Sequence, residues 1–278
     1  MIIRGTTRLI AHIGYPTHTF KSPMIYNPYF ETAGIDALVT PMSVQAEAFT
    51  AFLPAIFSMT NIIGALITMP HKVTSAGLLA ELSPSAQIAG ACNAVIKRAD
   101  GSLYGDMFDG EGFVRGMQRK GFAAAGASVL VVGSGGVGSA IAASLAAAGV
   151  ARMALFDTRP EVTEALAARL RQHYPALAIS LGERDPAGKH LVVNATPVGM
   201  NPGDPLPMDV TRIAPGCFVG EVVMTAEMTP FLQQAKARDC VIQVGTDMLF
   251  EQIPAYLEFF GLPSTTPEHL RAVARLSY

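Results

Sequence analysis

One charged residue stands where it could carry a proton. Lys72 follows His71 and the apolar stretch Gly64–Pro70, in the sequence GALITMPHKVT. A lysine directly after a buried strand is either a solvated turn residue or an amine placed for chemistry. An amine accepts a proton only in its neutral form, which burial favours and a nearby carboxylate opposes. We interpret His71 as a residue of the turn.

A glycine-rich segment lies near the middle of the chain. It reads GSGGVG, follows the apolar run VLVV and precedes an alanine-rich segment, which together predict a strand, a turn and a helix. In that context backbone N–H groups and the helix dipole can hold a pyrophosphate. The alternative is a glycine turn that only packs the helix on the strand. The predicted cofactor-binding residues of this turn are Gly133, Ser134, Gly135, Gly136, Val137 and Gly138.

An acidic residue closes the next predicted strand, ARMALFD. Asp157 can accept hydrogen bonds from ribose hydroxyls and would repel a 2′-phosphate, so it favours NAD over NADP. Arg159, two residues later, could still pair with a phosphate. The alternative is that Asp157 caps the helix that begins at Pro160.

The composition limits the functional classes. The chain has 278 residues, 50% of them hydrophobic and 15% charged, with a net charge of −2. It therefore has no basic surface typical of proteins that bind nucleic acid or anionic membranes. The three cysteines lack the spacing of a metal site and fit reduced thiols. We find no uninterrupted apolar segment of about 18 residues, and we expect a cytoplasmic globular protein.

Short apolar runs alternate with longer helical patterns, which predicts an α/β protein with parallel strands. The ranges expected to form strands are 9–14, 37–43, 64–70, a hairpin in 94–105, 151–157, 190–196, 217–223 and 240–244. Helices are expected at 23–33, 45–58, 72–81, 160–173 and after Thr229-Pro230, with a further helix starting within 105–121. The remainder, 247–278, is expected to be helical.

Several ordered motifs resemble those of the shikimate/quinate dehydrogenase family over essentially the whole chain. They are Gly14-Tyr15-Pro16, Ser22-Pro23 with Asn27, Thr68-x-Pro70-x-Lys72, Gly90-Ala91-Cys92-Asn93, Gly105 with Asp109-Gly110, the glycine-rich turn, Asn194-Ala195-Thr196 with Gly199-Met200, Thr229-Pro230, and Gly245 with Met248-Leu249 and Gln252.

The resemblance implies an N-terminal α/β substrate-binding domain (1–108), a Rossmann-like NAD(P)-binding domain (109–246), and C-terminal residues 247–278 that return to the first domain. It implies a catalytic pair, Lys72 and Asp109, in which lysine is the general base. The implied substrate-binding residues are Ser22, Thr68, Asn93 and Gln252. The implied cofactor-binding residues, besides the glycine-rich turn and Asp157, are Asn194, Thr196 and Gly245.

The chain departs from the family pattern where polar residues are usual. Phe20 replaces the first serine of Ser-x-Ser-Pro, and Leu66 replaces an asparagine. Phe108 and Met224 stand where threonine and tyrosine are common, and Glu221 replaces an aspartate. A missing charge-assisted hydrogen bond costs about 1.5–3 kcal/mol, so these losses weaken shikimate binding unless other groups substitute. The groups that could do so are Thr19, Lys21 and Tyr26.

We therefore predict an NAD-preferring dehydrogenase that oxidises a secondary alcohol on a small cyclic hydroxy acid, such as shikimate or quinate. One alternative is a dehydrogenase for a different, less polar alcohol. Another is an NAD-binding sensor without turnover. The sequence predicts no oligomeric state.

Overall fold

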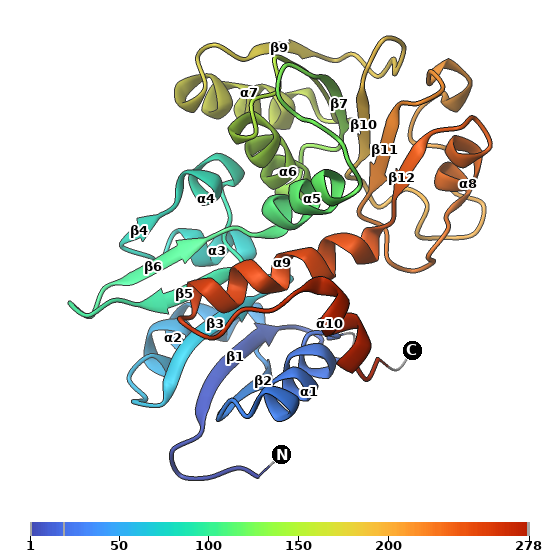
Figure 1. Ribbon diagram of the computed structural model, residues 1–278. Coiled ribbons are helices and arrows are strands. Elements are labelled where there is room, and N and C mark those ends of the chain that lie inside the picture. Colours follow the sequence, from blue (N-terminus) through green and yellow to red (C-terminus); the bar gives the residue numbers. More distant parts are fainter. Residues whose placement is uncertain (1, 19, 277–278) are drawn as a thin grey trace. The chain divides into compact units, whose positions relative to one another are not determined.

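The computed structural model describes residues 2–18 and 20–276, and it divides the chain into two units (Figure 1). Unit 1 extends to Phe108 and resumes at Ile253, whereas unit 2 is Asp109–Gln252. The second boundary lies inside the helix α9 (Gly245–Phe259), later than the expected break before residue 247. No helix among the described residues has both the length and the hydropathy that crossing a membrane requires.

Unit 1 is built around a mixed six-stranded sheet with the order β2-β1-β3-β5-β6-β4. Its strands are β1 (Arg8–Gly14), β2 (Ala37–Ser43), β3 (Ile62–Ile67), β4 (Glu81–Leu82), β5 (Ala94–Lys97) and β6 (Leu103–Asp106). Its helices are α1 (Pro23–Ala33), α2 (Ala46–Ile56), α3 (Lys72–Ala76), α4 (Pro84–Ala89), the second half of α9, and α10 (Pro267–Val273). The strands β1, β2 and β3 are parallel, and β5 forms antiparallel pairs with β3 and β6.

The C-terminal segment packs on α1 (Figure 1). The Tyr29 hydroxyl donates a hydrogen bond to the carbonyl of Pro263 at 2.9 Å, and the N–H of Arg275 donates to the carbonyl of Met24 at 2.8 Å. Both contacts join residues far apart in the chain, so the end of the chain completes unit 1.

The middle of unit 1 differs from the prediction. The expected helix 72–81 ends at Ala76, with Gly77 in the cap position, and the chain then forms the short strand β4 and the unpredicted helix α4. Ser83 begins α4, since its hydroxyl accepts a hydrogen bond from the N–H of Ala86 at 3.1 Å. The strand β3 also begins and ends earlier than the expected range 64–70.

Unit 2 contains a parallel six-stranded sheet with the order β12-β11-β10-β7-β8-β9. Its strands are β7 (Ser128–Val132), β8 (Arg152–Phe156), β9 (Ala178–Leu181), β10 (Leu191–Asn194), β11 (Phe218–Glu221) and β12 (Val241–Gln243). Its helical elements are α5 (Asp109–Arg119), α6 (Gly136–Ala147), α7 (Pro160–His173), η1 (Val210–Arg212), α8 (Pro230–Lys236) and the first half of α9. The strand β9 and the turn η1 were not predicted.

This strand order is that of a doubly wound nucleotide-binding sheet, in which the direction of winding reverses between the first and fourth strands. Here these strands are β7 and β10, which pair in parallel from Val129 to Val132. Every residue of β7 and of β10 is buried, as expected for central parallel strands covered on both faces. The carboxyl ends of these two strands are therefore the expected ligand-binding edge of unit 2.

Candidate functional site

The glycine-rich turn joins β7 to α6 and requires two of its glycines for steric reasons. Gly133 has a φ of +102°, and a Cβ there would lie 2.7 Å from the carbonyl oxygen of Ala195. A Cβ on Gly138 would lie 2.0 Å from the carbonyl oxygen of Gly133. These glycines therefore allow the sharp turn and the close packing of helix on strand.

The other two glycines leave open space. A Cβ on Gly135 or on Gly136 would meet no atom within 4 Å, and both residues are exposed. Gly135 precedes the first residue of the twelve-residue helix α6, whose N-terminal N–H groups and dipole favour an anion. The hydroxyl of the buried Ser134 has no hydrogen-bond partner among the described residues. The turn thus fits the pyrophosphate of a dinucleotide.

Asp157 lies directly after β8 and is tied to this turn. Its Oδ2 accepts a hydrogen bond from the N–H of Ser134 at 2.8 Å, and its Oδ1 accepts one from the N–H of Arg159 at 3.1 Å. Burial alone would raise the pKa of the Asp157 carboxyl, but these two backbone hydrogen bonds hold the pKa below its ordinary value. The alternative role as the cap of α7 is not observed, because Arg159 holds the cap position.

Asn194 and Thr196 use their side chains within their own loop after β10. The Asn194 Oδ1 accepts from the Thr196 hydroxyl at 2.6 Å, and the Asn194 Nδ2 donates to the carbonyl of Val198 at 2.9 Å. These polar atoms therefore shape the loop that borders the glycine-rich turn. The side chains act as supports, and contact with a cofactor would come from the loop they hold.

A buried polar network that the sequence did not predict lies at the ends of β10 and β11. Glu221 is fully buried beside Asn194 in the neighbouring strand, and the Thr229 hydroxyl donates to its Oε1 at 2.7 Å. Burial raises the pKa of Glu221, while its hydrogen bonds with Thr229 and Asn194 lower it by less. Gly245 is close by, because a Cβ on it would lie 2.1 Å from the carbonyl oxygen of Val223.

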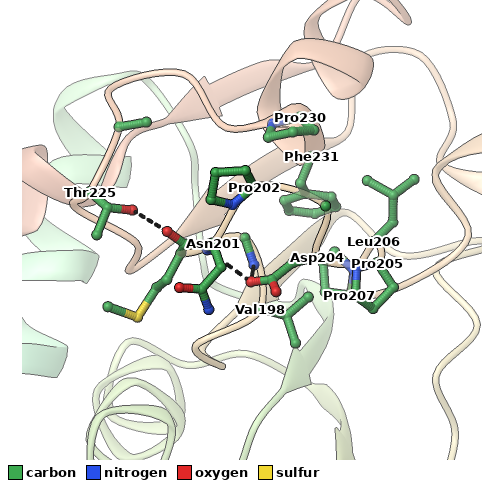
Figure 2. A pocket seen from close by; sticks show the side chains of 14 residues that line it. Val198, Asn201, Pro202, Asp204, Pro205, Leu206, Pro207, Thr225, Pro230 and Phe231 are labelled. Carbon is green, nitrogen blue, oxygen red and sulfur yellow. Dashed lines mark hydrogen bonds between the residues drawn. The ribbon is translucent and has the colours of Figure 1, made fainter.

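A hollow of about 260 Å³ lies in unit 2 beside the loop that follows Thr196 (Figure 2). Asp204 holds this loop, since its Oδ2 accepts hydrogen bonds from the N–H groups of Gly199 and Asn201 at 2.9 and 3.0 Å. The Thr225 hydroxyl donates to the carbonyl of Met200 at 3.3 Å. The residues that line it, all in the described part of the chain, include no lysine, histidine or cysteine.

In unit 1, Lys72 is the first residue of α3 and is partly buried. The turn before it is anchored to β1, because the N–H of Thr68 donates to the carbonyl of Ile13 at 2.9 Å. His71 is buried in the same turn, stacks on Phe49 at 4.0 Å, and contacts the carbonyl of Val44 through Nε2 at 2.8 Å. His71 is thus a structural residue, and the turn holds Lys72 at the carboxyl end of β3.

Asn93 positions the backbone that leads into Asp109. Its Oδ1 accepts a hydrogen bond from the N–H of Phe108 at 2.9 Å, and its side chain is almost fully buried. Asp109 itself is buried and is the first residue of α5, where the helix dipole favours a negative charge.

The remaining predicted substrate residues differ in their surroundings. Ser22 precedes α1 but its hydroxyl does not cap the helix. Gln252 is buried in α9, and its Oε1 has no hydrogen-bond partner among the described residues. It lies where α9 approaches α5, since a Cβ on Gly112 would be 2.7 Å from the Gln252 Cβ. The amide oxygen of Gln252 is therefore a buried polar atom without a partner among the described residues.

Sequence reasoning missed one residue of unit 1. His12 lies in β1, is only 6% exposed, and its Nδ1 has no hydrogen-bond partner in the described part of the chain. It stacks on Phe20 with 4.0 Å between ring centroids. Burial, and then the positive charge of Lys72, lower the pKa of His12 to about 3. A histidine within the otherwise apolar run LIAHIG was the signal that could have identified it.

The other residues that depart from the family pattern, and the residues named as their possible substitutes, have diverse surroundings. Leu66 is buried in β3, and Met224 is 41% exposed. Phe108 packs on Tyr256 and Phe259 of α9, at 4.8 and 5.3 Å between ring centroids. Tyr26, named as a possible substitute ligand, is buried with an unpartnered hydroxyl among the described residues, and burial raises its pKa. Thr19, also named, lies outside the described residues.

Comparison with known proteins gives matches over nearly the whole chain. Residues 12–95 match the model of the shikimate dehydrogenase substrate binding domain. The chain is 36% identical over 277 residues to the shikimate dehydrogenase (NADP(+)) of Acidiphilium cryptum, covering 99% of this chain and 98% of that protein.

Two solved structures are similar to the full chain. Shikimate 5-dehydrogenase from Listeria monocytogenes, in complex with shikimate and NAD, has a TM-score of 0.90 and 25% identity, covering 98% of this chain and 97% of that chain. The ligand-free 5-ketofructose reductase of Gluconobacter sp. strain CHM43 has a TM-score of 0.88 and 25% identity, covering 96% of this chain and 97% of that chain.

Unit 2 contains a doubly wound sheet with an open glycine turn, and unit 1 matches a substrate-binding domain. Together these features define a pyridine-nucleotide-dependent oxidoreductase. Within that class, the chain belongs to the shikimate/quinate dehydrogenase family. Unit 2 is its Rossmann domain and unit 1 its substrate-binding domain. The name of the similar enzyme from Acidiphilium cryptum contains NADP(+), whereas the similar structure from Listeria monocytogenes contains NAD. The comparisons therefore support a pyridine-nucleotide cofactor but do not distinguish NAD from NADP.

Proposed function

We propose that this protein catalyses the reversible, NAD(P)-dependent oxidation of a secondary alcohol on a small polyhydroxylated substrate, with the cyclic hydroxy acids shikimate and quinate as the first candidates. The observation that carries the proposal is the retention of Lys72 and Asp109 in a chain whose glycine-rich turn is open to a pyrophosphate. Relatives named shikimate dehydrogenase and a neighbour bound to shikimate support the substrate class.

Lys72 is the proposed general base. Oxidation of a CH–OH group releases a proton from the hydroxyl oxygen, and the neutral Lys72 Nζ would accept it. A bound nicotinamide ring supplies the hydride acceptor. Asp109 would orient the amine and stabilise the ammonium ion that forms. Asn93 would support this pair through its hydrogen bond to the N–H of Phe108.

The other residues have proposed binding roles. Ser22, Thr68 and Gln252 would position substrate hydroxyls or a carboxylate, consistent with the unpartnered oxygen of Gln252. The backbone of residues 133–138, the loop held by Asn194 and Thr196, and the close approach at Gly245 would hold the dinucleotide. We propose a preference for NAD over NADP, since a charged Asp157 beside the glycine-rich turn would repel a 2′-phosphate.

The three cysteines are free and buried, in keeping with the cytoplasmic location that we propose.

A second candidate substrate is an alcohol without a carboxylate. It is favoured by Phe20, which stands at a position where the family pattern has serine and which stacks on His12. A neighbour named 5-ketofructose reductase supports this candidate, because its named substrate is an uncharged ketose.

The test is nucleotide reduction by the purified protein with shikimate and with quinate, using NAD⁺ and NADP⁺ separately. We expect turnover that falls by at least about 10²-fold in Lys72→Ala, the magnitude of general acid–base catalysis, with nucleotide binding retained. Lys97→Ala is the matched control, since Lys97 lies in β5 and donates to the carbonyl of Phe57. Full activity of Lys72→Ala would show that another group is the base.

A further inference from the structure

An unexplained polar atom lies in the centre of the substrate-binding domain. His12 occupies β1 between its two parallel neighbours, opposite Pro41 of β2 and Leu66 of β3. Its Nδ1 is buried without a partner in the described part of the chain. Leaving a buried polar group unpaired costs about 1–3 kcal/mol, so this nitrogen requires a partner such as an ordered water or a polar group of a ligand.

The surroundings of His12 are those of the candidate substrate site. A Cβ on Gly14 would lie 2.4 Å from the Thr68 Cγ2 and 2.8 Å from the Phe20 Cζ, so these three residues are in contact. Phe20 in turn stacks on the His12 ring with an angle of 25° between the ring planes. Lys72 is close enough for its charge to act on His12. His12 thus belongs to one cluster with Thr68 and the proposed base.

The chemistry of this cluster suits an uncharged group. A neutral imidazole offers one N–H donor and one acceptor nitrogen, which match a hydroxyl or a carbonyl. The face of a phenyl ring carries partial negative charge, so Phe20 favours C–H groups and disfavours a carboxylate. Because burial and Lys72 lower its pKa to about 3, His12 stays neutral near pH 7 and offers no charge to a carboxylate.

We propose that His12 and Phe20 form a specificity-determining pair that binds an uncharged hydroxyl- or carbonyl-bearing part of the substrate in the place where the family pattern provides the first serine of Ser-x-Ser-Pro. The pair selects a neutral polyol or ketose over a hydroxy acid. This inference rests on the proposed dehydrogenase function, and of the two candidate substrate classes named there it favours the second, the alcohol without a carboxylate.

The experiment measures kcat and KM for ketone reduction with NADH and with NADPH. The probes are 5-ketofructose, an uncharged ketose, and the 3-dehydro acids of shikimate and quinate. The wild type is expected to show a kcat/KM at least tenfold higher for the ketose. His12→Leu is expected to raise KM for the ketose at least tenfold with a smaller change in kcat, whereas His12→Asn retains part of the affinity because an amide can still pair with a hydroxyl.

Phe20→Ser is expected to shift the ratio of kcat/KM toward the dehydro acids by at least tenfold. His269→Leu is the matched control, since His269 contacts Tyr29 at the start of α10 and lies outside the cluster. Its kinetic constants should match the wild type. Binding of reduced nucleotide and the melting temperature show whether each variant is folded.

A wild type that prefers the dehydro acids, or an unchanged KM for the ketose in folded His12→Leu, would overturn the inference while leaving the dehydrogenase intact. Failure to reduce every ketone despite nucleotide binding would overturn both the inference and the substrate class of the proposed function. Activity that survives Lys72→Ala would instead reject only the assigned base.

Discussion

The Asp157 carboxylate accepts a hydrogen bond from the backbone N–H of Ser134 at 2.8 Å. The residue expected to discriminate between ribose hydroxyls and a 2′-phosphate is therefore fixed to the turn expected to bind the pyrophosphate. Its second oxygen accepts from the N–H of Arg159, so the carboxylate is held from both sides. We expect a carboxylate held in this way to disfavour a 2′-phosphate, because it cannot turn away from one.

Asp157→Asn tests this relationship. The amide keeps an oxygen that can accept from Ser134 but loses the negative charge. The ratio of kcat/KM for NAD⁺ to that for NADP⁺ is expected to fall at least tenfold, or about 1.4 kcal/mol. Steady-state kinetics with both nucleotides measure it. Asp185→Asn is the control, because Asp185 is an exposed partner of Arg212. A wild type that prefers NADP⁺ would show that Asp157 serves the turn alone.

Gly135→Ala and Gly138→Ala separate binding from folding. A methyl group at residue 135 would meet open space, and the φ there is an ordinary −70°. The free energy of unfolding of Gly135→Ala should therefore equal that of the wild type or exceed it by up to about 1 kcal/mol. Nucleotide affinity should fall at least about tenfold, because the backbone there must approach a pyrophosphate.

A methyl group on Gly138 would instead collide with the carbonyl of Gly133. Gly138→Ala should lower the free energy of unfolding by about 1–3 kcal/mol, the usual cost of overpacking. Urea denaturation and fluorescence titration with NADH measure the two quantities. If both variants lost stability equally, the space at Gly135 would be occupied in solution.

Asn93→Ala tests the support of Asp109. The change leaves the N–H of Phe108 without its buried acceptor, which should cost about 1–3 kcal/mol of stability. It should also lower kcat by about tenfold or more, since small displacements of catalytic groups are costly. Asn61→Ala is the control, because the Asn61 side chain donates to the carbonyl of Thr7 at 3.3 Å and lies in unit 1, away from Asp109 in the sequence. A normal kcat in a destabilised Asn93→Ala would limit Asn93 to a structural role.

Much of the fold was predictable because local signals agreed with the tertiary structure. The ranges 23–33, 37–43 and 160–173 form the predicted elements α1, β2 and α7, each with a proline or a glycine at a boundary or a clear apolar pattern. The glycine-rich turn was recognisable because its glycines are required by backbone geometry, which any sequence with this turn must satisfy.

The elements that were missed lack a strong local signal. The strand β9 has only four residues, three of them exposed, and it exists because β8 offers it a parallel partner. The stacking of Phe20 on His12 joins a loop to a strand, so no spacing in the sequence reveals it. Similarly, no motif revealed that the Asn194 side chain forms hydrogen bonds within its own loop, and its predicted contact with a cofactor stays a prediction.

His12 also predicts how stability depends on pH. Its pKa is about 3 in the folded protein and about 6.5 in an unfolded chain, so the unfolded state binds more protons between these values. Stability is therefore lost as the pH falls from about 6.5 toward 3. Between pH 6.5 and 5 the loss attributable to this residue is about 1.5 kcal/mol.

His12→Leu removes this proton uptake and places an apolar side chain in β1. Between pH 6.5 and 5, the free energy of unfolding of this variant should therefore fall less than that of the wild type, by a difference of about 1.5 kcal/mol. Urea denaturation at several pH values would measure this difference. His269→Leu, at the exposed start of α10, should retain the wild-type slope. Equal slopes for wild type and His12→Leu would mean that His12 takes up its proton in the folded protein as readily as in the unfolded chain. A partly charged imidazole could then bind a carboxylate near pH 7, and the proposed selection of neutral substrates would lose its basis.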